Sequence, residues 1–80
     1  MKFNSIYRGK IISVDEINHR AQVRVPPIDG GETDPYRVSD DMLSLYRSIV
    51  SLSKSDIGSI VFVMYEGENT DTGVILGKLW

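Results

Sequence analysis

The chain has 80 residues, nine basic and eleven acidic, and a formal net charge of −2. A chain this short has room for one hydrophobic core, so we expect a single domain over residues 1–80. It has no cysteine and one histidine, which excludes disulfides and leaves no ligand set for zinc. Its basic residues are dispersed and its apolar runs are short. Neither nucleic-acid binding nor stable membrane insertion is therefore expected.

The first two expected strands cover residues 5–15 and 20–26. The first is rich in β-branched and aromatic residues. Gly9 stands in its middle, a position typical of a bulge or a sharp bend. The second alternates between apolar and polar residues, which predicts one face toward a core, and two prolines end it.

The middle of the chain is expected to be mostly irregular. Residues 26–41 contain prolines, glycines and aspartates in turn-forming combinations. Ser39 or Asp40 can cap a short helical turn that runs on to Leu45. A third strand is then expected over residues 46–52.

The last two expected strands carry most of the apolar side chains. Residues 59–65 are apolar on both faces of the strand, and residues 73–79 form the closing strand, with Gly77 as a second bend. The polar sequence "EGENTDTG" between them reads as a hairpin connection.

These elements predict an all-β protein. The sequence lacks the strand–helix–strand alternation that would indicate a parallel sheet. Short strands with glycine bends, in a chain too small for a sandwich, favour a small five-stranded antiparallel OB-fold barrel with one short helical turn. An SH3-like barrel is the alternative.

Residues 56–80 resemble the end of the OB domain of phage baseplate hub spike proteins, the baseplate assembly protein V group and its type VI secretion relatives. That family pattern has a glycine turn, an apolar strand, an acidic hairpin with glycine, and a last strand framed by glycines. Here Gly58 stands in the turn, Gly67 in the hairpin, and Gly73 and Gly77 at the ends of the "GVILG" sequence. The sequence "YRGKIISVDEINHRAQVRVPPI" is similar to the family's first hairpin.

The resemblance implies a structural protein of the virion. It would be an OB-fold module of the central spike in a phage tail baseplate hub or related contractile injection machine, made in the host bacterial cytoplasm. A homotrimer, contacts with other tail or hub proteins, and a spike domain or tip that follows Trp80 are implied. No enzymatic activity and no cofactor are expected. The glycines expected to serve as structural turns are Gly9, Gly58, Gly67, Gly73 and Gly77.

The fourth strand predicts an interaction surface. Its neighbouring residues face opposite sides of the sheet, so its unbroken apolar run cannot all enter one core. Either the set with Phe62 or the set with Val63 should face a neighbour or be covered by residues 28–45. The candidate interface residues are Phe62, Val63, Leu79 and Trp80.

Single-stranded nucleic-acid binding is the alternative function. OB-folds bind single strands with a basic groove and stacked aromatic side chains. The net charge of −2 and the absence of a basic stripe favour the structural role. The residues that could bind nucleic acid are Arg8, Lys10, Arg20, Arg24, Tyr7, Tyr36 and Tyr46.

No catalytic or metal constellation emerges from the sequence. His19 lies in an expected turn without an identifiable nucleophile, so a surface role is preferred. Three carboxylates, Asp29, Glu32 and Asp34, surround two glycines, yet they lack the spacing of a calcium-binding EF-hand loop. A solvated loop is the preferred interpretation.

Overall fold

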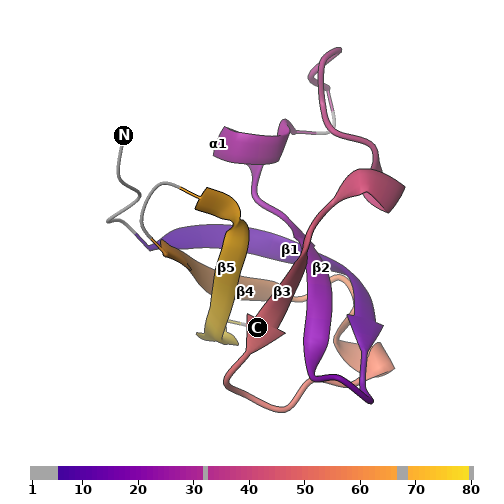
Figure 1. The fold of residues 1–80 in the computed structure, drawn as a ribbon. Coiled ribbons are helices and arrows are strands. Elements are labelled where there is room, and N and C mark those ends of the chain that lie inside the picture. The colour runs from indigo at the N-terminus through magenta and orange to yellow at the C-terminus, as the bar shows by residue number, and fades with distance from the viewer. Residues whose placement is uncertain (1–5, 32, 67–68, 80) are drawn as a thin grey trace.

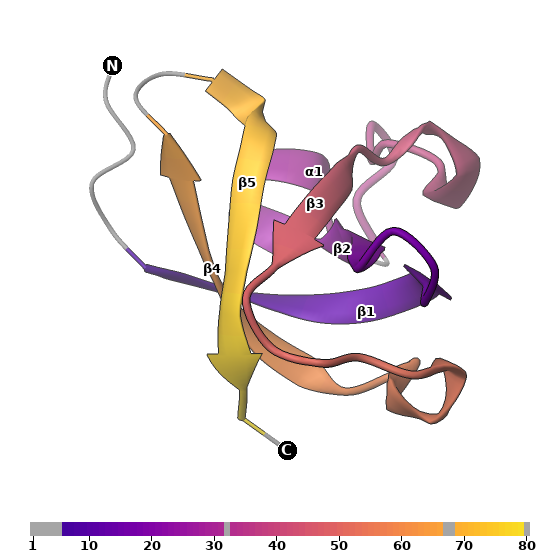
Figure 2. The same cartoon turned by 60° about the horizontal axis from the view of Figure 1, so that its bottom comes forward.

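The computed structural model describes residues 6–31, 33–66 and 69–79. Five strands account for most of the ordered backbone (Figures 1 and 2). Their bounds are β1 Tyr7–Asp15, β2 Arg20–Arg24, β3 Leu45–Ser48, β4 Ile60–Glu66 and β5 Asn69–Lys78.

The strands close into a barrel in the order β1-β2-β3-β5-β4, with β4 paired back to β1. Four of the five pairings are antiparallel, whereas β3 and β5 run parallel, with Arg47 opposite Val74. The predicted all-β five-stranded barrel is confirmed, and this strand order is that of an OB-fold. The predicted antiparallel arrangement holds for four pairs and fails for β3–β5, because the β4–β5 hairpin brings β5 back beside β3 in the same direction (Figure 2).

The core lies inside the barrel and draws on all five strands. The predicted alternation of β2 is confirmed, since its apolar face is fully buried. β4 turns Val61, Val63 and Tyr65 inward, and Ile60, Phe62 and Met64 face out. The buried core residues are Ile11, Ala21, Val23, Val25, Tyr46, Val61, Val63, Tyr65 and Ile75.

Two strand boundaries differ from the prediction by four residues, and the others differ by two or fewer. β3 ends at Ser48 rather than at residue 52, because the Ser48 hydroxyl donates to the Val50 carbonyl at 2.6 Å and turns the chain away. β5 begins at Asn69 rather than at residue 73, and Glu66 pairs with Asn69. Backbone ladder bonds form without apolar side chains, so the polar composition of this hairpin was misleading. Gly67 lies outside the described residues.

Three short helical turns are described. The expected turn is confirmed only as a 3₁₀ turn, η1 Asp40–Met42, which ends before Leu45. A second 3₁₀ turn, η2 Lys54–Asp56, and a four-residue helix, α1 Pro26–Asp29, were not predicted. Proline at the first helical position has a suitable fixed φ and loses no hydrogen bond, so the prolines that end β2 also begin α1.

Gly9 does not form a bulge, since β1 pairs with β4 without a register shift from Tyr7 to Lys10. The register of β1 shifts at residue 12 instead, between Ile11 and Ser13. Gly9 is buried within β1, where an added Cβ would lie 2.3 Å from Cγ1 of Val23. The position requires glycine because two strands approach closely.

Gly73 is likewise a close-approach position, because an added Cβ would lie 2.9 Å from the ring of Tyr46. Gly58 is in a turn, with a φ of +93° that other residues rarely adopt. Gly77 lies beside a register shift in the β4–β5 pair, and an added Cβ there meets nothing within 4 Å.

Candidate interaction surface

A buried arginine, Arg24, binds the base of residues 26–44, which connect β2 to β3 and are called here the connection. The side chain of Arg24 is 6% exposed, and its guanidinium donates to the carbonyls of Asp29 at 3.2 Å, Gly30 at 3.1 Å and Val38. It also pairs with Oδ1 of Asp40 at 2.7 Å, and this hydrogen bond lowers the pKa of the Asp40 carboxyl. The guanidinium thus fixes both limbs of the connection to the barrel.

The polar face of β2 binds this connection along its length. The side-chain amide of Gln22 donates to the carbonyls of Leu43 at 2.9 Å and Asp40 at 3.2 Å. Its oxygen accepts from the hydroxyl of Ser13 at 2.7 Å. The residues that alternation alone assigns to solvent, Gln22 and Arg24, therefore serve as the platform for residues 26–44.

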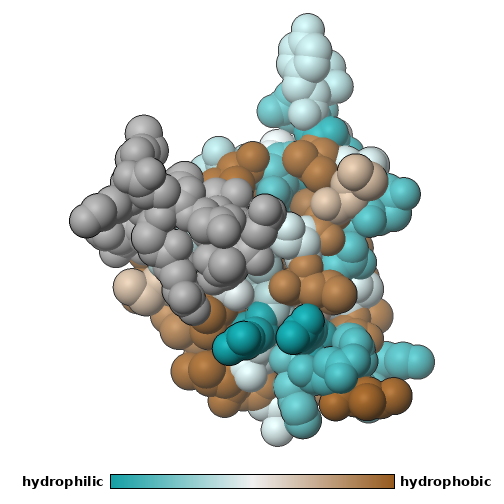
Figure 3. Space-filling model, viewed as in Figure 1, coloured by the Kyte–Doolittle hydropathy of each residue, from teal (hydrophilic) through white to brown (hydrophobic). Residues whose placement is uncertain are grey.

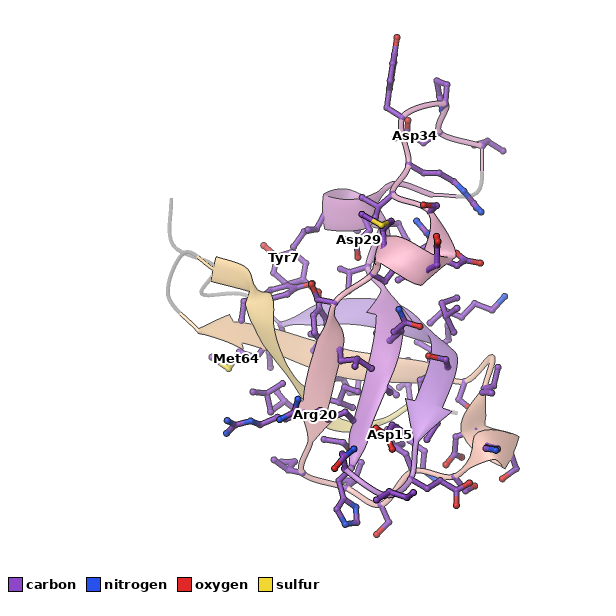
Figure 4. The ribbon with its side chains drawn as sticks, turned by 45° about the vertical axis from the view of Figure 1, so that its right-hand side comes forward. Tyr7, Asp15, Arg20, Asp29, Asp34 and Met64 are labelled. Carbon is purple, nitrogen blue, oxygen red and sulfur yellow. The ribbon has the colours of Figure 1, made fainter. Side chains whose placement is uncertain are left out.

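The connection rises from this platform as a loop that projects from the barrel (Figures 1 and 4). Its two limbs are joined, since the Val38 amide donates to the Asp29 carbonyl at 2.8 Å. Gly30 has a φ of +87°, and an added Cβ there would lie 2.7 Å from Cα of Arg37. The limbs therefore pack backbone against backbone.

The tip of the loop is a β-turn over Asp34-Pro35-Tyr36-Arg37. The Arg37 amide donates to the Asp34 carbonyl at 3.3 Å, and the Tyr36 amide donates to Oδ1 of Asp34 at 2.9 Å. Proline at the second position of a β-turn and aspartate at the first are both favoured. The turn presents Tyr36 to solvent with 93% of its surface exposed.

A second exposed feature crosses the outer side of the sheet. Arg20 pairs with Arg47, Arg47 with Val74, and Val74 with Met64. Directly paired residues point to the same side, so these four form one line across β2, β3, β5 and β4, called here the outer row. Both arginines are exposed, and Met64 is 41% exposed.

The outer row combines exposed charge with apolar surface. Like charges directly opposite each other in a sheet repel. Arg20 is also the ladder partner of Asp15 on β1, whose carboxylate attracts it, whereas Arg47 forms no salt bridge with a described residue. On the side of the molecule where β3 and β5 face the viewer, strongly hydrophilic atoms lie beside apolar ones (Figure 3). This arrangement suits a partner that offers both an anion and an apolar contact.

The outward residues of β4 and β5 surround the row. Phe62 and Leu79, two of the predicted interface residues, are partly exposed there. Val63 was wrong as an interface residue, because it is completely buried in the barrel core. Trp80 lies outside the described residues.

Three of the seven nucleic-acid candidates are occupied within the fold. The guanidinium of Arg24 is engaged by hydrogen bonds to the connection. Tyr46 is 2% exposed, and its hydroxyl lies 3.0 Å from that of Tyr65, whose pKa is raised by burial and by this contact. The ring of Tyr7 packs edge to face on Tyr65, with 5.6 Å between centroids. Arg8, Lys10, Arg20 and Tyr36 remain exposed.

The other candidate residues have local structural roles. His19 is exposed in the β1–β2 turn with a φ of +54°, and its carbonyl accepts from the Ser48 amide at 3.1 Å. Asp29 and Asp34 accept backbone hydrogen bonds within their own loop, from Val25 and from Tyr36. Glu32 lies outside the described residues. Within the described part of the chain no group of three or more metal-ligating side chains occurs.

The comparisons with known proteins found no match to any family model, curated protein or solved structure. A search of the described residues for a helix long and apolar enough to cross a membrane also found none.

Proposed function

We propose that this chain is a structural OB-fold module that works by self-association, in the central spike of a phage tail baseplate hub or a related contractile injection machine. The observation that carries the proposal is the apolar outer side of β4 and β5. Val61, Val63 and Ile75 fill the core at 0% exposure, so the outward apolar residues are surplus to it. They are Ile60, Phe62, Met64, Val74, Leu76 and Leu79.

Self-association is supported by the size and chemistry of the chain. A contiguous apolar surface on a small soluble domain marks a binding site. An 80-residue chain without cysteine has a small core, and burial between subunits would add to its stability. The resemblance of residues 56–80 supports a spike module and, with it, a homotrimer.

Solution mass tests the self-association. Light scattering coupled to size exclusion should give three times the 9.0 kDa chain mass. Met64→Glu should shift the protein to monomer, because it puts a charge in the apolar surface. Ile17→Glu is the matched control, since Ile17 is 88% exposed in the β1–β2 turn and should leave the mass unchanged. A monomeric wild-type mass at high concentration contradicts the proposal.

Location tests the assignment to a tail. Immunogold labelling of particles released from the cell that encodes the chain should decorate the baseplate end of tailed particles. Particles with intact baseplates and no label would contradict the assignment. Sub-micromolar binding of a single-stranded oligonucleotide at physiological salt, lost in Arg8→Glu, would favour the alternative function instead.

A further inference from the structure

We infer that copies of this chain join head to tail, with the projecting tip of one copy seated on the outer row of the next. The inference rests on the proposed self-association and names the two surfaces that produce it. The occupant of the outer row is thus a second copy of this chain, contacting it through residues 33–38.

Charge complementarity is the first argument. The contacting residues 33–38 hold one acidic residue, Asp34, and one basic residue, Arg37, within a connection that is acidic overall, with five acidic residues and one basic residue in residues 29–41. The outer row presents two exposed arginines that oppose each other across the β2–β3 pair. An arriving carboxylate would relieve their repulsion and gain charge-assisted hydrogen bonds from a guanidinium, which binds carboxylates in a two-pronged geometry.

Apolar complementarity is the second argument. The tip ends in Tyr36, which is 93% exposed, and the row ends in Val74 and the 41% exposed Met64. Aromatic side chains pack favourably on methionine sulfur, and tyrosine is enriched among residues that dominate binding at interfaces. The tip offers an anion beside an aromatic ring, and the row offers cations beside an apolar surface.

Preorganisation is the third argument. The tip is fixed by the Asp34 turn, by the Asp29–Val38 hydrogen bond between its limbs and by the Arg24 guanidinium at its base. A loop that is already ordered loses little conformational entropy on binding. An exposed tyrosine on such an ordered loop is suited to anchor a binding partner.

The contact must form between molecules. Asp34 lies at the far end of the projecting loop, whereas Met64 and Arg20 lie on the barrel, well separated from it (Figure 4). The loop is fixed at its base and cannot bend back to its own outer row. A contact between two different surfaces of identical chains is heterologous, and it closes into a ring when the rotation per copy permits. In a closed ring of three copies, every tip would be seated on the outer row of a neighbour.

Two single variants and their mixture test the inference by light scattering and sedimentation. Tyr36→Ala removes the anchor and Arg47→Glu reverses a charge of the row, and both side chains are exposed, so the fold should persist. Each variant alone should weaken self-association by about tenfold or more. Ile17→Ala, exposed outside both surfaces, is the control and should retain the wild-type mass.

The mixture distinguishes head-to-tail joining from other geometries. The Arg47→Glu chain keeps an intact tip and the Tyr36→Ala chain keeps an intact row, so equal amounts should form a one-to-one dimer that neither forms alone. A wild-type assembly that persists unchanged in Tyr36→Ala would overturn the inference and leave the proposed self-association standing. A monomeric wild type would overturn both. A single-stranded oligonucleotide that binds the row and is released by Arg47→Glu, with no effect on protein mass, would assign the row to nucleic acid.

Discussion

The barrel and the β2–β3 connection are held together by different forces. In the barrel, nine buried residues pack at exposures of 3% or less around backbone ladders on every side. In residues 26–44, Leu43 is the only described residue that is buried, and polar contacts to Gln22 and Arg24 carry the structure. The barrel is maintained by apolar burial and the connection by hydrogen bonds to the side chains of Gln22 and Arg24.

This difference separates stability from association. Changes in the barrel core should lower the free energy of unfolding of the whole domain. Changes at Arg24 should mainly loosen the connection, and changes at the tip should alter only self-association.

Gly9→Ala should be the most damaging single change in the barrel. The added Cβ would lie 2.3 Å from Cγ1 of Val23 and 3.1 Å from the Arg24 carbonyl oxygen, so packed backbone must move. We expect a loss of about 3 kcal/mol of unfolding free energy in urea titrations. Gly77→Ala, with nothing within 4 Å of its Cβ, is the control and should change stability by less than about 0.5 kcal/mol. Equal effects of the two variants would contradict the packing described.

Arg24→Met should loosen the connection and spare most of the barrel. It removes the donors to the Asp29, Gly30 and Val38 carbonyls, and we expect a loss of about 2 kcal/mol. Hydrogen exchange should accelerate at the Val38 amide and stay slow at the Ile75 amide in β5. Arg24→Lys should not restore the connection, because an ammonium cannot reproduce the guanidinium fork. Uniform acceleration across the barrel would show that the two regions are not separable.

Gly58→Ala sharpens the comparison at the second long connection, which joins β3 to β4. Gly58 has a φ of +93°, and no atom lies within 4 Å of an added Cβ, so only backbone strain is at issue. We expect a loss of about 1 kcal/mol. Gly58→Asn, which tolerates positive φ better, should lose less. The reverse order of the two variants would contradict a strained turn.

Acid should weaken both regions through different carboxyls. The Arg24 hydrogen bond lowers the pKa of Asp40 in the connection. Hydrogen bonds from the Ser53 amide and from Lys78 lower the pKa of Asp56, beside the barrel. Groups with a lowered folded pKa contribute stability above the ordinary aspartate value of 3.8, and that stability is lost as the pH falls through the lower folded values.

Unfolding measured from pH 7 downward should therefore be nearly level until about pH 4 and then decline. Asp56→Asn should flatten this decline for the whole domain. Asp40→Asn should flatten it only for exchange of amides in the connection. A stability that rises as the pH falls below 4 would contradict the sign of both shifts.

The barrel could be predicted because its signals are local. The alternation in residues 20–26 and the apolar run in residues 59–65 each specify a strand, and the glycines and turn residues between them leave room only for short helical turns. The parallel β3–β5 pair was not predictable from such patterns, since it depends on the path of the chain between β3 and β4. Gly9 was located correctly in a strand. A glycine required by close approach to Val23 looks the same in the sequence as a glycine that forms a bulge.

The interaction surface was only partly predictable. An apolar surplus on β4 follows from sequence, but the choice between the faces of Phe62 and Val63 needs the register of the sheet. The role of Arg24 depends on contacts 5 to 16 residues away. The only hint in the sequence was that Arg24 is a charged residue at the end of an alternating strand, shortly before two prolines. Tyr36 became an anchor candidate only when the loop was seen to project.

Photo-crosslinking from the tip tests the head-to-tail contact most directly. Benzoylphenylalanine at position 36 keeps an aromatic ring on the exposed turn and should not disturb the fold. Irradiation of the assembled protein should join this position to residues of β3, β4 or β5 in another copy, near Arg47 and Met64, and mass spectrometry of the cross-linked peptides would identify them. Crosslinks between two copies of position 36, or attachment only within the chain that carries the probe, would contradict the account.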